Sequence, residues 1–165
     1  MTMGELNLLD QASFVEAVGW VFEHSPWVAE RAWTARPFAS LDDLHRAMTE
    51  QVDQATPAQQ LALLRAHPDL GARARMSAAS VGEQAGAGLD SLTVEEFEHF
   101  HHLNAVYRAR FGFPFLLAIK GFAKADILCS LAVRMESSPE DEFYEALREV
   151  YRIARFRLES IVTVG

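Results

Sequence analysis

Residues 138–161 read "SPEDEFYEALREVYRIARFRLESI", a stretch typical of a long amphipathic helix. Ser138 precedes Pro139, and an acid stands at Asp141, which is typical of a helix start. The serine and the acid can satisfy free backbone amides, and proline needs no N–H in the first turn. Apolar side chains then recur at steps of three and four, which predicts one buried stripe along a long final helix. The stripe consists of Phe143, Leu147, Val150, Tyr151, Ala154, Leu158 and Ile161.

The same start pattern recurs through the chain. Helix starts are predicted at Ser25-Pro26, Ser40…Asp43, Thr56-Pro57…Gln59, Ser80…Glu83 and Thr93…Glu96. Residues 44–52 and 97–111 also carry apolar side chains at helical spacing, and no stretch alternates as a strand would. The sequence therefore predicts an all-α protein, a single-domain helical bundle of roughly eight helices over residues 1–165.

Composition narrows the function classes. Half of the 165 residues are hydrophobic and the formal net charge is −8, so a real core is expected, while nucleic acid and anionic membranes are poor partners. No apolar run approaches the ~18 residues of a membrane span, and the N-terminal "MTMGELNLLDQASF" lacks the pattern of a signal peptide. Cys129 is the single cysteine, expected to be a small buried hydrophobe. A cytoplasmic location follows as the expectation.

A histidine stands at the end of one predicted helix, in "RAHPDLGARARM", residues 65–76. Pro68 disfavours helical geometry at its predecessor, so His67 should be extended at the helix end and Asp69 should cap the next turn. An imidazole can exchange a proton near neutral pH, so His67 is a candidate proton-transfer residue. The alternative is a helix-stop histidine that faces water.

A second candidate is "SVGEQ", residues 80–84. Ser80 and Glu83 have the spacing of a capping box, which would be a sufficient structural reason for both, whereas Gln84 has none. Together the three side chains could clamp a ring rich in amides, and the alternative is an ordinary capped loop.

The third candidate is Arg157, which lies beside Val150 on the flank of the apolar stripe of the final helix. A guanidinium buried on that flank must be paired or must hold an anion, because an unpaired buried charge is very costly. Two readings remain: an internal salt bridge, or a bidentate grip on a substrate carboxylate or oxyanion.

Two further stretches carry glycine and proline breaks or clustered histidines. In "FGFPFLLAIKGF", residues 111–122, Gly112 should stop a helix, Pro114 should set a bend and Gly121 should mark another break. In "HFHH", residues 99–102, the three histidines fan around the helix, so we expect a solvated face and no metal site.

These motifs, taken in order, resemble the 2-oxo-4-hydroxy-4-carboxy-5-ureidoimidazoline (OHCU) decarboxylase family. The resemblance rests on "EHSPWVAERAW", "RPF", "HPDLG", "SVGEQ", "LNAVYRARFGFPF" and "RFRL", and covers about Leu6 to Leu158. It implies an all-helical single domain, usually a homodimer, which acts late in urate breakdown. The implied reaction converts the ureidoimidazoline carboxylate to (S)-allantoin and carbon dioxide with no cofactor. The implied partner is therefore a small-molecule ureidoimidazoline substrate.

The resemblance also implies roles for single positions. His67 matches the catalytic histidine, and the resemblance together with the chemistry gives Glu83 and Arg157 catalytic roles beside it. Leu116 stands where the family often has a β-branched residue, a mild departure. The implied substrate-binding positions, by side chain or by backbone, are Pro68, Ser80, Gln84, Phe113, Phe115, Leu116, Leu117, Ile119 and Gly121.

Other functions remain open at this point. A non-catalytic helical module that binds ureides or a partner enzyme of the same pathway would show no turnover with His67 intact. A plain helical scaffold would leave Arg157 and the Ser-Glu-Gln cluster as coincidences. A metalloprotein would lose its activity on chelation.

Overall fold

The computed structural model describes residues 1–71 and 78–163. Within these residues it contains nine α-helices, three short 3₁₀ helices and no strand, so the all-α prediction is confirmed with one helix more than the rough count. The chain forms two compact units, Met1–Ala66 with Tyr151–Gly165 and His67–Val150. The long helix α9, Pro139–Ile161, contributes residues to both.

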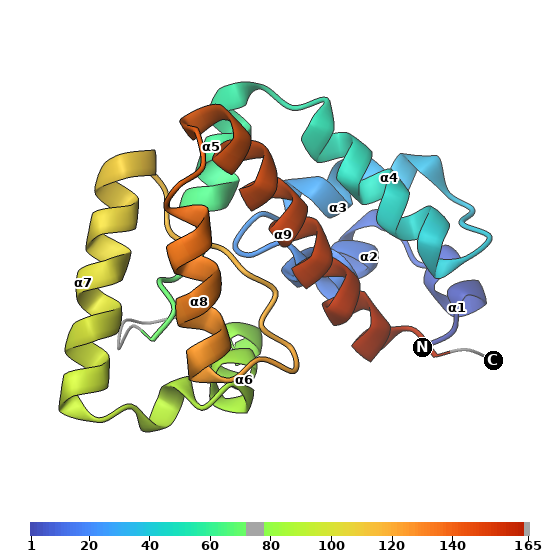
Figure 1. Ribbon diagram of the computed structural model, residues 1–165. Coiled ribbons are helices and arrows are strands. Elements are labelled where there is room, and N and C mark those ends of the chain that lie inside the picture. The colour runs from blue at the N-terminus through green and yellow to red at the C-terminus, as the bar shows by residue number, and fades with distance from the viewer. Residues whose placement is uncertain (72–77, 164–165) are drawn as a thin grey trace. The chain divides into compact units, whose positions relative to one another are not determined.

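The first unit consists of helices from the N-terminal part of the chain and the C-terminal turns of α9. Its other α-helices are α1 (Met3–Asn7), α2 (Gln11–Val18), α3 (Trp27–Ala32), α4 (Leu41–Asp53) and α5 (Pro57–Arg65), with 3₁₀ turns at Gly19–Val21 and Trp33–Ala35. Helix α3 packs against both α2 and α4. The predicted stripe of Leu44, Met48 and Val52 is fully buried, as its spacing requires. Met1 lies beside the end of α9 (Figure 1), where its carbonyl accepts the Thr163 N–H at 2.8 Å.

The second unit carries most of the predicted site residues. Its elements are α6 (Ala78–Gly86), the 3₁₀ turn Leu89–Ser91, α7 (Val94–Phe111), α8 (Lys124–Arg134) and the first turns of α9. Helices α7 and α8 run parallel (Figure 1) and are tied at both ends. The Lys124 ammonium lies 3.2 Å from Glu96 near their starts, and Arg110 donates to the Ser137 carbonyl at 3.0 Å near their ends. Because parallel neighbours need a crossover, residues 112–123 cross back as an irregular segment.

Most of the predicted helix starts are confirmed. Thr56 and Thr93 form complete capping boxes, and Ser40 and Ser138 each accept an amide three residues on at 3.2 Å. Gly112 ends α7 in the left-handed conformation, with φ 84°, as its position predicted.

Three local predictions are wrong. Ser25 does not cap α3, because its hydroxyl donates to the Glu23 carbonyl instead. Ser80 does not begin a helix, because α6 already includes Ala78, so Ser80 and Glu83 lie inside the helix rather than forming a capping box. Cys129 is exposed on α8 rather than buried.

No helix among the described residues is long and apolar enough to cross a membrane.

His45 on α4 should make stability depend on pH. Its Nε2 donates to the Tyr151 carbonyl at 2.8 Å, and partial burial lowers its pKa from 6.5 despite that bond. The unfolded chain therefore binds the proton first, so stability is unaffected above pH 6.5 and falls as pH drops below it. Urea unfolding from about pH 7.5 to about pH 5.5 should show a smaller loss for His45→Gln than for the wild type. Exposed His99 offers the control His99→Gln, and an equal loss in all three proteins would contradict the assignment.

Candidate active site

His67 lies just beyond the end of α5 and is buried. The helix ends at Arg65 with Ala66 as its C-cap, and Pro68 prevents the chain from continuing in helical geometry. The His67 side chain is only 6% exposed, so the alternative of a water-facing helix stop is wrong. A buried imidazole near neutral pH is a suitable proton-transfer group because small environmental shifts move its charge state.

The loop after His67 is held by Gln84 of α6. The Gly71 N–H donates to Gln84 Oε1 at 2.9 Å, and Gln84 Nε2 donates to the Asp69 carbonyl at 3.4 Å. Gly71 has a φ of 78°, a conformation that favours glycine at this turn. Gln84 therefore uses both ends of its carboxamide on the loop, and one of the two N–H groups of Nε2 is occupied in this way.

Helix α7 holds the same loop from a second direction. Asn104 Nδ2 donates to the Leu70 carbonyl at 2.8 Å, and Arg108 donates to the Asp69 carboxylate at 2.7 Å. Asn104 and Arg108 are four residues apart, so they lie on one face of the helix. The turn that Asp69 was predicted to cap continues into residues 72–77, which lie outside the described residues. Every residue from Asp69 to Gly71 thus has a polar group held by a side chain.

The predicted Ser-Glu-Gln cluster lies on one face of α6. Ser80, Glu83 and Gln84 occupy positions i, i+3 and i+4 of the helix, which share a face. Ser80 and Gln84 are buried, Glu83 is half-buried, and the intervening Val81 and Gly82 are exposed. The helix thus gathers the three side chains on its inner face, although it does so by helical periodicity and not through a cap.

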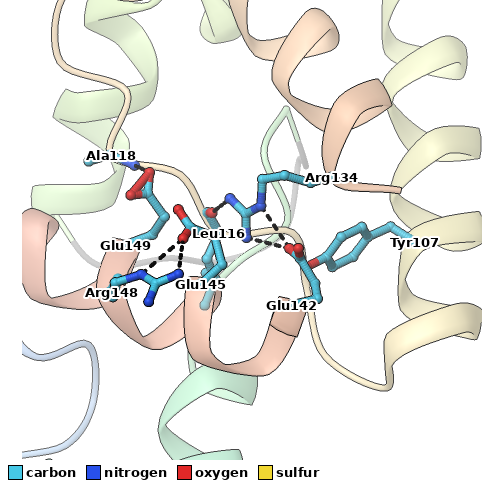
Figure 2. A network of polar contacts seen from close by, with 8 residues as sticks. All are labelled: Tyr107, Leu116, Ala118, Arg134, Glu142, Glu145, Arg148 and Glu149. Carbon is cyan, nitrogen blue, oxygen red and sulfur yellow. Dashed lines mark hydrogen bonds and ion pairs between the residues drawn. The ribbon is translucent and has the colours of Figure 1, made fainter. Parts of the chain in front are cut away.

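Residues 113–119, called here the 113–119 segment, form an irregular but entirely buried stretch. Its backbone is bound by side chains from two helices (Figure 2): the Arg134 guanidinium donates to the Leu116 carbonyl, and the Ala118 N–H donates to Glu149 Oε1 at 3.4 Å. A buried segment without regular structure must place its amides and carbonyls on such partners. The backbone that the family resemblance predicts to line the substrate site is therefore held in place by side chains of α8 and α9.

That support continues into a buried charged network. Figure 2 shows Arg134 between the Leu116 carbonyl and Glu142, with the Tyr107 hydroxyl aimed at the same carboxylate. Arg134 Nε donates to Glu142 Oε1 at 2.7 Å, Tyr107 donates to that oxygen, and the Glu142 side chain is fully buried. Burial, reinforced by the hydrogen bond to Glu142, raises the pKa of Tyr107 well above its usual range. The Arg134 guanidinium also lies 4.7 Å from the centre of the Phe115 ring.

Arg157 lies in the first unit, where it takes part in a buried ion pair. Its guanidinium donates to Glu23 Oε2 at 2.8 Å and to the Trp20 and Val21 carbonyls at 3.3 and 3.4 Å. The arginine and the glutamate are 5% and 0% exposed. The flank of the stripe is therefore buried at Arg157, and of the two predicted alternatives the internal salt bridge is present. Any anion that binds Arg157 must share the guanidinium with Glu23.

The remaining predicted positions fall in different surroundings. Gly121 is exposed, with a φ of 81°, just beyond the buried Ile119. His99, His101 and His102 are exposed on α7, as expected of a solvated face. Among the described residues no group of three His, Cys, Asp or Glu side chains has the arrangement of a metal site.

Several buried polar residues of the two units were not predicted. Asn104, Arg134, Glu142 and Glu149 are all buried, and Glu23 is the partner of Arg157. A signal was present for two of them: Asn104 interrupts the apolar stripe of residues 97–111, and Arg134 continues the face of Ile127 and Leu131. A polar side chain on an apolar stripe indicates a buried hydrogen bond, which periodicity alone does not assign to a partner.

Comparison with known proteins gives consistent matches over the chain. A family model described as OHCU decarboxylase matches residues 7–159. A 2-oxo-4-hydroxy-4-carboxy-5-ureidoimidazoline decarboxylase of Haloferax volcanii is 50% identical over 158 residues, which is 96% of this chain and 94% of that protein. The uric acid degradation bifunctional protein PucL of Bacillus subtilis is 51% identical over 98% of this chain, which spans 33% of that longer protein.

Solved structures agree on the fold. A crystal structure of (S)-allantoin synthase matches 99% of this chain and 54% of its own, with a TM-score of 0.78 and 33% identity. A crystal structure of an OHCU decarboxylase in the presence of (S)-allantoin matches 81% of this chain and 89% of its own, with a TM-score of 0.67. At 24% identity the second match supports the fold alone.

Proposed function

This chain belongs to the OHCU decarboxylase family, and from that premise we propose that it converts OHCU to (S)-allantoin and carbon dioxide without a cofactor. The family is one of carbon–carbon lyases of urate degradation. The observation that carries the proposal is a buried histidine at the family's catalytic position, in a loop held by buried polar side chains. The family match spans residues of both compact units, which supports one functional domain.

The chemistry asks little of the protein beyond orientation and charge. Loss of carbon dioxide leaves a carbanion that must be delocalised into the neighbouring ring system of the substrate, which carries its own electron sink. The enzyme must then orient the substrate, stabilise the developing oxyanion and deliver one proton to one face. We assign both proton transfers, removal from the substrate hydroxyl and delivery to carbon, to His67. Protonation from one side accounts for a single enantiomer of allantoin.

The α6 face supplies binding groups in this proposal. Ser80 and Gln84 bind ureido and ring amide groups, and Glu83 fixes the ring or the imidazole. Burial of Ser80 and Gln84 on a shared helix face supports this role, because hydrogen bonds are stronger away from water. Gln84 keeps a second Nε2 N–H beyond the bond to the Asp69 carbonyl, and that donor suits a substrate carbonyl.

The anionic oxygens of the substrate are assigned to Arg157 and to backbone amides near Ile119 and Gly121. The ion pair with Glu23 holds the guanidinium in place, and a planar fork of donors suits a carboxylate. The wall around the substrate is assigned to Pro68 and to the backbone at Phe113, Phe115, Leu116 and Leu117. Support for this assignment is their burial and the side-chain bonds to Leu116 and Ala118.

A homodimer and a cytoplasmic location complete the proposal. The dimer rests on the family resemblance, with the exposed Phe156 as a candidate contact, and light scattering of the purified protein tests it. The location rests on a single cysteine, which suits a reducing compartment.

Carbon dioxide release from freshly generated OHCU tests the reaction. We expect the protein to speed the release well above the spontaneous blank, and to keep doing so after dialysis against a chelator. A rate equal to the blank would favour the alternative, a non-catalytic module that binds ureides or a partner enzyme, and the affinity for allantoin would then be measured.

A further inference from the structure

The loop that follows His67 is anchored by two residues of α7 that no assigned role uses. Asn104 binds the Leu70 carbonyl at 2.8 Å, and Arg108 binds the Asp69 carboxylate at 2.7 Å. The two anchors are separated by one helical turn and grip consecutive residues of the loop. The two contacts therefore restrict both the sliding of the loop along the axis of α7 and its rotation relative to that helix.

Asn104 is an unusual choice for its position. It lies between Phe100 and Tyr107 on the buried stripe of α7 and is itself only 4% exposed. Its Oδ1 has no hydrogen-bond partner among the described residues. The bond from Nδ2 to the Leu70 carbonyl is therefore the hydrogen bond that the buried carboxamide makes there. A half-satisfied buried amide costs stability, and such a group calls for a reason other than stability.

Arg108 is the opposite case, since its side chain is half exposed. An ion pair between partly exposed groups contributes little to stability, roughly 0 to 1 kcal/mol. The pair with Asp69 nevertheless joins residues that are 39 positions apart in the chain. The ion pair therefore fixes the position of the loop while contributing little to the free energy of unfolding.

We propose that Asn104 and Arg108 are positioning residues, which hold Asp69 and Leu70 against α7 and thereby set the place of the His67 ring. Only Pro68 separates His67 from this anchored pair, and its fixed ring leaves the connection little freedom. A catalytic group displaced by about 1 Å loses up to about 100-fold in rate, so such an anchor matters for turnover. The proposal rests on the proposed role of His67.

The test uses Arg108→Met, which keeps the aliphatic stem and removes the guanidinium. Its matched control is Arg110→Met on the same helix, whose guanidinium binds the Ser137 carbonyl instead. We expect kcat of Arg108→Met to fall about 10- to 100-fold with KM nearly unchanged. The unfolding midpoint should move by no more than about 3 °C, and Arg108→Lys should recover part of the rate. The control should keep the wild-type kcat.

A double-mutant cycle then tests whether Arg108 acts through Asp69. Asp69→Asn keeps the shape of the side chain and removes its charge, so it should lower kcat to a similar extent. The double variant Asp69→Asn with Arg108→Met should fall no further than either single variant. Additive losses in kcat, or a kcat of Arg108→Met equal to that of Arg110→Met, would overturn the proposal.

A readout without turnover separates this proposal from the proposed function. Nitrogen resonances of the His67 imidazole report the surroundings of the ring whether or not the wild type turns over. They should shift in Arg108→Met and stay unchanged in Arg110→Met. If the wild type releases no carbon dioxide but this difference is present, the function fails and the positioning role stands. Unchanged resonances in both variants would overturn the positioning role.

Discussion

His67→Asn is expected to abolish turnover while leaving substrate binding largely intact. Asparagine keeps hydrogen-bonding capacity but cannot exchange a proton near neutral pH, and general acid–base catalysis contributes about 10²–10⁴ in rate. Initial rates of carbon dioxide release, with allantoin affinity measured by calorimetry, would give kcat and binding separately. The buried position of His67 makes a small, shape-preserving replacement the appropriate one.

The exposed His99 supplies the matched control, because His99→Asn removes an imidazole from the same unit. That variant should retain the wild-type rate. Near-normal turnover in His67→Asn would remove His67 from the mechanism, and loss of binding along with turnover would give it a binding role instead.

Glu142→Ala is expected to lower the free energy of unfolding by about 3–5 kcal/mol, the largest effect on stability that we foresee. The change leaves the buried Arg134 guanidinium without its carboxylate and leaves the Tyr107 hydroxyl without its acceptor. An uncompensated buried charge costs far more than the lost contact itself. Urea unfolding followed by far-ultraviolet circular dichroism measures the difference.

Glu145→Ala is the control on the same helix, three residues further along. Glu145 pairs with Arg148 at 2.7 Å, but the arginine side chain is 60% exposed, so the cost should stay below about 1 kcal/mol. Equal losses in the two variants would contradict the view that the Arg134–Glu142 pair supports the 113–119 segment as a buried unit.

Helix starts were predictable from sequence where the cap and its amide belong to one turn. Thr56 and Thr93 show this, since each box closes within four residues. Ser80 shows the limit: the spacing of a capping box, i and i+3, is also the spacing of neighbours on one helix face. Because α6 already includes Ala78, Ser80 and Glu83 belong to a polar face inside the helix rather than to a helix start.

In the candidate site too, groupings set by local spacing were predictable and long-range partners were not. Ser80, Glu83 and Gln84 were identified together because local spacing brings them together. The partners of Asn104 and Tyr107 are 34 and 35 positions away in the chain, and only tertiary packing specifies such pairs. The position of Arg157 on the flank of the stripe limited it to an ion pair or an anion site if buried, whereas its partner Glu23 lies 134 positions earlier. Sequence patterns therefore indicate which polar residues are buried before they indicate what those residues bind.

The handedness of the allantoin formed is the most direct test of the central claim. OHCU would be generated from urate by the two preceding enzymes and followed by circular dichroism with and without the protein. Spontaneous decay gives racemic allantoin and no lasting signal. We predict a fast and persistent signal of the S enantiomer, because protonation at His67 takes place from one face. A trace that matches the blank would contradict a stereospecific decarboxylase.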